Sequence, residues 1–574
     1  MNQNIRIAQI IIIFYIFILI PSSLFCIDIF GKELEWNPGI LGGIPTIPAV
    51  VNVMDFGATG DGVTDDSAAF QTAINTVAGQ GAVEIPSGTY LIMAKLSLPD
   101  GVVLRGAGTD NTHLNINHSN HTFEMLTYER GQWINITSSV SAGETIIPVA
   151  DTSPFEVGLY VEIQKDNDPA IMYTIPDWDQ SWADGAMGQI TQVTAVGTDS
   201  ITTDKPLRLD YPSSLNPVIR TNGFIEWVGF EDFHVKRIDN SDTSIFFFKN
   251  VANCWIKNIK SEYCSKMHVT TNTGYRIEVR DSFFNESTNW GGGGHGYGVE
   301  LGFHSTDCLI VNNVFKHLRH SMMVHVGANG NFFGYNYSIE PQSEADWIPG
   351  DISLHGHYPY YNLFEGNIVN RIGIGDYWGP AGPNNTIFRN SVLLKDIYAE
   401  DSSQHQNIIG NFIEPGTFYY DQDDRWPHNI DLSTYIMHGN WYDGLMHWDP
   451  AISDHTIPDS YYYTSKPSFY GKMGWPSVGA DFPGGGTNPA RERWLAENPT
   501  PSPISTPDPS LVGDANGDGS VNIVDALLVA QYYVGLDPVV FKAANADTNC
   551  DGSVNIIDAL LIAQFYVGLI NSFC

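Results

Sequence analysis

Short apolar runs recur along the middle of the chain, and a polar residue, usually asparagine, stands just ahead of each apolar pair. The spacings between these markers are 23, 32, 23, 31, 23 and 21 residues, and the markers are Asn258, Asp281, Asn313, Asn336, Asn367, Asn390 and Asn411. A basic period in the low twenties is what one coil of a parallel β-helix needs. We therefore predict coils stacked about 4.8 Å apart, with the asparagine amides forming a ladder from coil to coil.

An amphipathic helix is predicted ahead of these coils. Thr64 or Asp65 provides an N-cap. The apolar face then repeats with helical period at Ala69, Phe70, Ala73, Ile74 and Val77. Residues 81–90 follow as a strand and a turn.

The string from Val51 to Ile74 resembles the opening of pectate-lyase-like right-handed parallel β-helices, in which a helix caps the first coil. The resemblance implies an all-β catalytic module over residues 50–497 and a polysaccharide substrate. It implies structural rather than catalytic roles for the acidic residues of the string, which are Asp61, Asp65 and Asp66.

The N-terminal stretch predicts a signal peptide over residues 1–26. Arg6 precedes an apolar run from Ile7 to Ile20, which is the arrangement of a secretory signal. The run is short for a bilayer span, so we favour a secreted, extracellular protein without a membrane segment after cleavage over an anchored one. Near the other end, prolines crowd residues 498–510 and predict an extended linker.

Two copies of one short pattern, 33 residues apart, end the chain. Oxygen-bearing side chains stand at positions 1, 3, 5, 7, 9 and 12, with glycine at position 6. This is the spacing of an EF-hand loop, in which a hard cation collects oxygen ligands. It predicts two calcium ions, bound by Asp514, Asn516, Asp518, Ser520, Asn522 and Asp525 in the first copy and by Asp547, Asn549, Asp551, Ser553, Asn555 and Asp558 in the second.

Each loop runs into an apolar helix, and this tandem resembles a dockerin, the module that attaches a secreted polysaccharide-degrading enzyme to a cohesin on a scaffold. Position 12 is aspartate instead of the usual glutamate, and linker rather than a helix precedes the first loop; both features fit dockerins. The resemblance implies a dockerin over residues 511–570 and a scaffold- or cell-surface-associated enzyme. The cohesin is expected to contact Ile523-Val524 and Ile556-Ile557. A calcium buffer is the alternative.

Net charge bears on the class of binding partner, and cysteine content bears on disulfide bonding. The formal net charge is −36, with only 28 Lys+Arg, so a nucleic-acid partner is not expected, because binding it needs a basic footprint. Six cysteines in 574 residues make no disulfide framework. Cys254, Cys264 and Cys308 are expected as buried thiols, and a disulfide between Cys550 and Cys574 would close the C-terminus.

Two of the coil spacings are eight or nine residues longer than the others. If both inserts leave the helix on one side, they form two walls around the coils that start at Asn313 and Asn336. The segment Lys316–His325 between the walls is the densest cluster of basic and titratable side chains. Functional residues often lie on loops held by a rigid scaffold, so we place the active cleft here.

Two reactions could cut a uronic-acid polysaccharide in this cleft. Hydrolysis needs two carboxyl groups, whereas β-elimination needs a base and a cation that holds the substrate carboxylate. Basic residues dominate the central segment, so we favour a lyase, with His320 as general base and Arg319 or Arg371 as the carboxylate clamp. The candidate catalytic residues are His320, Arg319, His325, Asp351, His355, His295 and Arg371; hydrolysis would turn attention to Asp346, Asp351, Glu300 and Asp376.

The candidate substrate-binding residues are Lys316, His317, Glu340, Asp376 and Trp378. His317, Glu340 and Arg371 belong to a column of side chains four residues after the markers, which is either a binding strip or a solvated charge ladder. A further metal, held by three histidines in the cleft, is an alternative use of the imidazoles. Its candidates are His295, His304, His320, His325, His355 and His357.

Three functions stay open at this stage. The favoured one is a polysaccharide lyase, with a glycoside hydrolase on the same fold as its alternative; Gly294-His295-Gly296 looks like an element of the polygalacturonase signature, but the rest of that signature is missing. The second is a non-catalytic carbohydrate-binding β-helix. The third is a structural cell-surface protein, against which the loops rich in His, Arg and Asp argue.

Overall fold

The computed structural model describes residues 33–171, 181–342, 348–376, 378–400, 402–420, 430–498, 512–536, 538 and 541–573. The chain folds into two compact units, Met1–Glu492 and Arg493–Cys574. The expected all-β class, with a parallel β-helix followed by a small α-helical module, is confirmed. Among the described residues, no helix combines the length and the apolar character that a membrane crossing requires.

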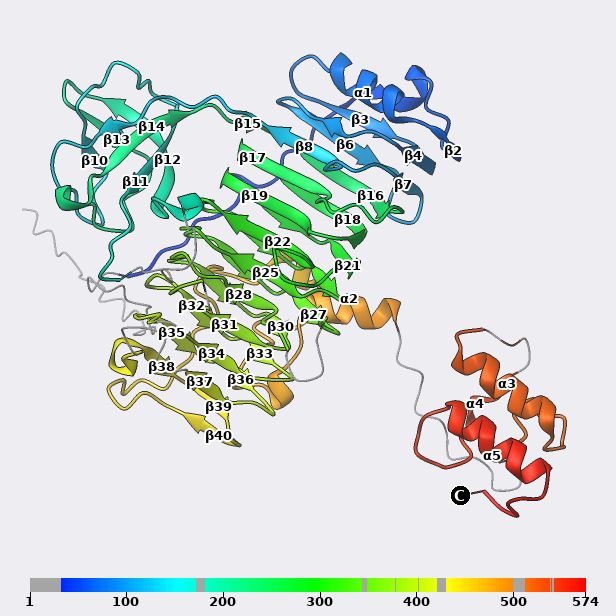
Figure 1. Ribbon diagram of the computed structural model, residues 1–574. Coiled ribbons are helices and arrows are strands. Elements are labelled where there is room, and N and C mark those ends of the chain that lie inside the picture. Colours follow the sequence, from blue (N-terminus) through cyan, green and yellow to red (C-terminus); the bar gives the residue numbers. More distant parts are fainter. Residues whose placement is uncertain are drawn as a thin grey trace, which may run out of the picture. The chain divides into compact units, whose positions relative to one another are not determined.

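The first unit is a stack of β-coils, in which one strand of each coil pairs in parallel with its counterpart in the next (Figure 1). One sheet has 23 strands: β1 (Ala49–Asn52), β2 (Asp61–Asp65), β3 (Gly81–Ile85), β4 (Gly88–Ile92), β6 (Val102–Gly106), β7 (Thr112–Ile116), β16 (Gly229–Arg237), β18 (Trp255–Cys264), β20 (Glu278–Arg280), β21 (Phe283–Ser287), β23 (Leu309–Val311), β24 (Val314–Lys316), β26 (Phe332–Gly334), β27 (Tyr337–Ile339), β29 (Leu363–Glu365), β30 (Ile368–Val369), β32 (Thr386–Phe388), β33 (Ser391–Val392), β35 (Asn407–Ile409), β36 (Phe412–Ile413), β38 (Ile436–His438), β39 (Asn440–Tyr442) and β40 (Leu445–His447).

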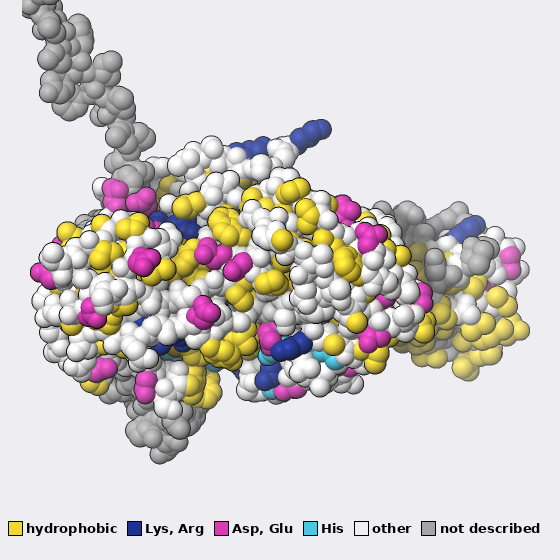
Figure 2. Space-filling view, turned by 90° about the horizontal axis from the view of Figure 1, so that it is seen from above, with side chains coloured by type: hydrophobic (Ala, Val, Ile, Leu, Met, Phe, Trp, Pro, Cys, Tyr) yellow, Lys and Arg dark blue, Asp and Glu magenta, His cyan; other side chains and the backbone are white. Residues whose placement is uncertain are grey.

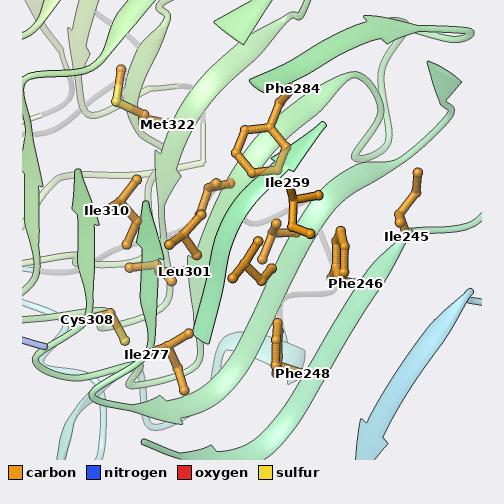
Figure 3. Packing of buried hydrophobic residues seen from close by; sticks show 14 of the residues in the cluster. Ile245, Phe246, Phe248, Ile259, Ile277, Phe284, Leu301, Cys308, Ile310 and Met322 are labelled. Atoms are coloured by element: carbon orange, nitrogen blue, oxygen red, sulfur yellow. The ribbon is translucent and has the colours of Figure 1, made fainter. Parts of the chain in front are cut away.

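A second sheet of 11 strands closes the coils and carries the candidate site. Its strands are β5 (Leu96–Ser97), β8 (Phe123–Leu126), β15 (Ile225–Glu226), β17 (Phe246–Ala252), β19 (Met267–Tyr275), β22 (Tyr297–Gly302), β25 (His320–Val324), β28 (Ile352–Leu354), β31 (Ile372–Ile374), β34 (Ile397–Ala399) and β37 (Phe418–Tyr420). The inward side chains of both sheets fill a continuous apolar core, part of which is shown in Figure 3. Cys254, Cys264 and Cys308 are buried free thiols, as expected.

The asparagine ladder is confirmed, and its hydrogen bonds are regular. The side-chain Nδ2 of each member donates to Oδ1 of the next at 2.9–3.0 Å, through Asn313, Asn336, Asn367, Asn390, Asn411 and Asn440. Two expected members were wrong by one position, because Ile259 and Ser282 occupy the ladder level in their coils. Asn258 and Asp281 instead adopt left-handed turn conformations with φ of 51° and 55°, which asparagine and aspartate tolerate better than most residues.

The predicted capping helix is α1 (Ser67–Thr76), which buries Ala69, Phe70, Ala73 and Ile74. Its N-cap residue is Asp66 rather than the expected Thr64 or Asp65. The carboxylate of Asp65 accepts a hydrogen bond from the backbone N–H of Ser67 at 3.0 Å instead.

A separate domain is inserted between β8 and β15. It is a six-stranded antiparallel sheet and forms a lobe beside the coils (Figure 1). Its strands are β9 (Ile134–Asn135), β10 (Ile146–Pro148), β11 (Tyr160–Lys165), β12 (Met187–Val196), β13 (Ser200–Thr203) and β14 (Val218–Asn222). Tyr360 Oη donates to the carbonyl of Gly188 at 2.8 Å and thereby ties this domain to the coils.

Both ends of the first unit pack onto the coils. Trp36 donates its indole N–H to the carbonyl of Tyr361 at 2.7 Å, so the module begins earlier than residue 50. At the other end, Tyr461 packs against Phe388 with tilted rings whose centroids lie 4.4 Å apart, and Arg389 pairs with Asp481 at 2.6 Å. Residues 461–488 are therefore a packed tail of the β-helix.

The second unit contains a duplicated loop–helix motif. Its helices are α3 (Ile523–Tyr533), α4 (Ala543–Ala546) and α5 (Ile556–Tyr566), whereas α2 (Pro489–Glu497) crosses the boundary between the two units. Asn522 caps α3 and Asn555 caps α5, each within a reciprocal capping box with the aspartate three residues later. Cys550 is disulfide-bonded. Its expected partner Cys574, the predicted signal peptide 1–26 and most of the predicted linker 498–510 lie outside the described residues.

Candidate active site

Both long inserts lie at the same corner of the coils, as predicted. The first connects β21 to β22 and the second connects β27 to β28, so each passes from the 23-strand sheet to the 11-strand sheet. Residues 343–347 of the second insert, which include Asp346, lie outside the described residues. The corner borders a cavity of about 370 Å³ on the outer face of the 11-strand sheet.

The cavity is lined from three directions. Strands β22 and β25 contribute Tyr297, Glu300 and Met323, and His325 and His355 directly follow β25 and β28. The first insert contributes Gly292, Gly293 and Gly294, and the inserted domain contributes Trp182. Met267, Arg319 and Trp378 complete the lining. Trp182 packs against His357 with tilted rings whose centroids lie 4.5 Å apart, so an aromatic side chain from the inserted domain covers the histidine-rich side of the cavity.

His325 and Glu300 form the first imidazole–carboxylate pair of the site. They come from neighbouring coils, because β22 pairs in parallel with β25. Nε2 of His325 lies 2.8 Å from Oε1 of Glu300, at an angle that does not make a hydrogen bond. Burial would raise the pKa of Glu300, but the imidazole of His325 outweighs burial and lowers it. Glu300 therefore stays ionised.

His355 and Asp376 form the second pair, one coil further along. Nδ1 of His355 lies 3.2 Å from Oδ2 of Asp376. Burial lowers the pKa of His355 and raises the pKa of Asp376. A carboxylate at Nδ1 holds that nitrogen protonated and leaves the lone pair on Nε2, which is the state required of a general base.

His320 lies behind the cavity wall rather than in it. Its Nδ1 donates to the carbonyl of Gly350 at 2.7 Å, and its ring lies 5.0 Å from that of Tyr297 and 5.8 Å from that of His355. Burial holds the pKa of His320 well below its usual value. His320 is therefore a neutral neighbour of the site and a weaker candidate for the base than His355.

The two arginines proposed as clamps are placed differently. Arg319 lines the cavity and donates from Nη1 to the carbonyl of Gly291 at 2.6 Å. Arg371 stacks 4.1 Å above the ring of Tyr398 and donates to the carbonyl of Ile348 at 2.8 Å. It is not among the residues that line the cavity, so Arg319 is the better placed of the two.

Several other candidates lie outside the cavity. His295 binds Asp242, with Nε2 2.8 Å from Oδ1, and its neighbouring loop rather than its own ring reaches the cavity. Asp351 is fully buried and accepts hydrogen bonds from Ser338 and Asn370 at 2.8 and 2.9 Å. These bonds satisfy its carboxylate within the coil, so the structure gives it a structural environment.

Lys316, His317 and Glu340 lie on the other sheet, at β24 and β27. His317 bridges two carboxylates, Glu286 at 2.5 Å and Glu340 at 2.7 Å, and Lys316 lies 3.3 Å from Glu340. This arrangement matches the solvated charge ladder rather than a binding strip. Asp376 and Trp378, by contrast, belong to the cavity or its border.

The six histidines considered as metal ligands do not meet at one point of the cleft. His320, His325, His355 and His357 lie near the cavity, whereas His304 pairs with Glu162 at 2.9 Å and His295 with Asp242. Within the described ranges, no group of three or more His, Cys, Asp or Glu side chains is arranged to hold a metal ion. The structure thus gives no support to the cleft metal.

The same absence extends to the described residues of the two loops predicted to bind calcium, so the case for an ion there depends on their oxygen donors. Asp514 and Asp547, at position 1 of each loop, are buried, and Oδ1 of Asp547 has no hydrogen-bond partner. A buried carboxylate oxygen without a partner is costly, and a hard cation would satisfy it. The oxygen-only donor set at this position fits calcium.

Sequence comparisons match two segments of the chain. Residues 50–151 match the family described as "Rhamnogalacturonase A/epimerase, pectate lyase-like", and residues 512–565 match the dockerin type I domain. The chain thus carries a pectate-lyase-like domain and a dockerin, as the sequence patterns indicated.

Individual relatives match only short segments. The chain is 49% identical over 70 residues to mannuronan C5-epimerase AlgE4 of Azotobacter vinelandii, a match that covers 11% of this chain and 13% of the relative. It is 39% identical over 80 residues to the pre-neck appendage protein of Bacillus phage phi29, covering 14% of this chain and 9% of the relative. These matches therefore span a small part of each relative's length.

Solved structures with a similar fold are distant in sequence. The tailspike protein gp49 from Pseudomonas phage LKA1 has a TM-score of 0.49 at 15% identity and covers 64% of each chain. The A-module of AlgE4 from A. vinelandii has a TM-score of 0.32 at 14% identity, covering 68% of this chain and 95% of that one.

Sequence reasoning missed the contribution of the inserted domain. Trp182 and Tyr297 line the cavity, yet neither stands in a recognisable motif. Glu300 carried a signal, because it follows the glycine-rich stretch of the first insert, but the reasoning treated it only as a carboxylate for hydrolysis. Its pairing with His325 depends on the register between coils, which the sequence does not display.

Proposed function

We propose that this protein is a carbohydrate-active enzyme that cleaves a uronic-acid-containing polysaccharide in the cavity lined by Glu300, His325 and His355. The observation that carries the proposal is the pair of imidazole–carboxylate contacts, His325–Glu300 and His355–Asp376, on successive coils beside one cavity. Titratable groups with shifted pKa values, gathered in a cleft, are typical of catalytic sites.

The arrangement supports β-elimination. In this reaction a base removes the proton at C5 of the uronate, the electron pair forms the C4–C5 double bond, and the glycosidic oxygen leaves from C4 with a proton. His355 is the proposed base, because Asp376 orients its ring and burial keeps it neutral. Arg319 is proposed to neutralise the substrate carboxylate, whose charge increases as the proton leaves.

Hydrolysis is the second candidate, and a specific observation favours it. Glu300 lines the cavity and Asp376 borders it, so two carboxyl groups are present, and the environments of these two shift their pKa values in opposite directions. One protonated acid and one ionised carboxylate are what a glycosidase requires.

Product analysis of the full chain separates the two reactions. The protein is incubated with a panel of pectic, alginate-type and glucuronic-acid-containing polysaccharides. The elimination proposal predicts new ultraviolet absorbance from an unsaturated sugar end, in step with new reducing ends. Reducing ends without that absorbance would replace elimination by hydrolysis, and neither signal on any substrate would contradict both cleavage reactions.

We further propose that the second unit binds two calcium ions through the twelve loop residues named above and docks onto a cohesin of an extracellular scaffold. The dockerin match and the buried carboxylates at loop position 1 support this. Ile523, Val524, Ile556 and Ile557 are each about half exposed, at 48–53%. Exposed apolar pairs repeated in both halves are the proposed contact surface.

A further inference from the structure

A second cavity, of about 270 Å³, lies where the inserted domain meets the β-helix. Trp182 lines both this cavity and the candidate active site, so the two hollows share a wall. The charged residues that line the second cavity are Arg130, Glu162, Asp184, Arg220, Lys249 and His304. Cations therefore outnumber carboxylates in it.

Glu162 already has partners for both of its carboxylate oxygens. Its Oε2 accepts hydrogen bonds from Nε and Nη2 of Arg220 at 2.8 and 2.5 Å, and its Oε1 lies 2.9 Å from Nδ1 of His304. Nε2 of His304 lies 2.8 Å from the carbonyl of Gly185, which only accepts. Burial would raise the pKa of Glu162, but its hydrogen bond with His304 and the charges of Arg220 and Arg130 outweigh burial and lower the pKa.

Arg130 and Lys249 form no salt bridge with a carboxylate within the described part of the chain. Burial lowers the pKa of Arg130, and the charge of Glu162 opposes this only in part. Nη2 of Arg130 donates to two neutral oxygens, those of Asn250 at 2.5 Å and Thr273 at 3.1 Å, and its Nε is buried without a hydrogen-bond partner. Nζ of Lys249 lies 5.1 Å from the ring centroid of Tyr128. Burial and the nearby charge of Arg130 both lower the pKa of Lys249.

A cavity in which three basic residues, Arg130, Arg220 and Lys249, face two carboxylates, Glu162 and Asp184, is unusual in this protein. The chain has 64 Asp+Glu against 28 Lys+Arg, and on the face shown in Figure 2 the dark-blue basic side chains are few. Two neighbouring cations in a partly desolvated hollow repel each other, so an anion that enters between them is attracted to both. Arg130 lines the cavity, and a guanidinium can pair with a planar carboxylate.

We propose that Arg130 and Lys249 form an accessory subsite that binds the carboxylate of a second uronic acid residue, away from the cleaved bond. Trp182, between the two cavities, supports the intervening sugar. This inference rests on the proposed function for its substrate class, and it adds that the enzyme selects chains with acidic residues on both sides of Trp182.

The test measures binding of the full-length protein by isothermal titration calorimetry. The ligands are a uronic acid oligosaccharide and the same oligosaccharide with its carboxyl groups reduced to alcohols. A charge-assisted hydrogen bond contributes about 1.5–3 kcal/mol, so Lys249→Gln should weaken uronate binding roughly 10-fold or more. The reduced ligand should bind wild type and variant equally. Lys236→Gln is the matched control, because Nζ of Lys236 also lies over a tyrosine ring, at 5.0 Å from that of Tyr263, and does not line either cavity.

Arg130→Gln serves as a second variant, with its melting temperature checked against wild type. Unchanged uronate affinity in a folded Lys249→Gln protein would overturn the subsite. Equal binding of a sulfated neutral oligosaccharide would overturn its assignment to carboxylates. Turnover is measured separately. A protein that binds uronate through Lys249 but cleaves nothing would contradict the proposed function and support the subsite. Cleavage with an unchanged KM in Lys249→Gln would support the proposed function and contradict the subsite.

Discussion

His355 and Asp376 meet across successive coils of the β-helix, with Nδ1 of the imidazole 3.2 Å from Oδ2 of the carboxylate. The strands that precede them, β28 and β31, pair in parallel, so the stacking of coils brings the two residues together over 21 positions of sequence. The contact fixes the imidazole tautomer, and this makes His355 the residue on which the proposed chemistry depends most.

Replacement of His355 by alanine should abolish most of the turnover. A positioned general base contributes about 10²–10⁴-fold to a rate, so His355→Ala should lower kcat by that factor on the best substrate. The control is His447→Ala, because His447 lies on β40 and does not line the cavity. Equal losses in both variants, or no loss in His355→Ala, would contradict the assignment.

The free energy of unfolding should fall in acid, because buried neutral histidines bind protons only once the chain is unfolded. Burial lowers the pKa of His268 to about 3 and that of His357 to about 3, from 6.5. Below pH 6.5 the unfolded chain binds protons that the folded one does not, so each residue removes up to about 1.4 kcal/mol of stability per pH unit down to its folded pKa.

Thermal melts between pH 7 and pH 3 test this. The midpoint should drop as the pH falls below 6.5, and His268→Asn should flatten that slope relative to wild type. A slope that is the same in wild type and His268→Asn would show that His268 is not buried in its neutral form.

The asparagine ladder should contribute to stability at each rung. Asn367 accepts from Asn336 and donates to the carbonyl of Phe333 and to Asn390. Asn367→Ala leaves these buried partners without a hydrogen bond, and each unsatisfied partner lowers the free energy of unfolding by about 1–3 kcal/mol. Asn75→Ala, at an exposed position of α1, is the control and should change little. Urea unfolding that finds equal midpoints for both variants would exclude an energetic role for the ladder.

The dockerin should unfold when calcium is removed. It should also lose cohesin binding when its exposed apolar pairs are replaced. Chelation should reduce the helical dichroism of this unit, because metal-binding energy is folding energy in small metal domains. Charged substitutions in both halves, at Ile523, Val524, Ile556 and Ile557, should abolish cohesin binding. The same substitutions in one half should leave binding, because the other half presents the same surface.

A matched control is Val63→Asp, which changes an exposed valine of the β-helix. Cohesin binding measured by surface plasmon resonance should not respond to it. Full binding by the four-site variant would contradict the proposed contact surface.

The sequence predicts the repeating parts of this fold well and its tertiary pairings poorly. The ladder from Asn313 onward follows from spacing alone, because each coil repeats one hydrogen-bond requirement. Ile259 and Ser282 broke the pattern, since side chains other than asparagine fill the ladder level there. The capping helix was likewise correct apart from its N-cap.

For the candidate active site too, the sequence predicts the location but not the side-chain pairings. The position of the cleft near the long inserts was predicted, because extra residues must leave the coil at a corner. The partners of each histidine were not, because they depend on register: His325 faces Glu300 and His317 faces Glu286 and Glu340, although both lie in one segment of sequence. Trp182 lies in an inserted domain without a periodic signal, so no pattern could place it at the cavity.

The most direct test is a crystal structure of the His355→Ala variant of the full chain with a uronic acid oligosaccharide. The account predicts sugar rings in the cavity beside Glu300, His325 and Trp182, with the C5 atom of one uronate facing the space left by the imidazole. Saccharide bound instead on the β24–β27 face, along Lys316, His317 and Glu340, with an empty cavity, would contradict it.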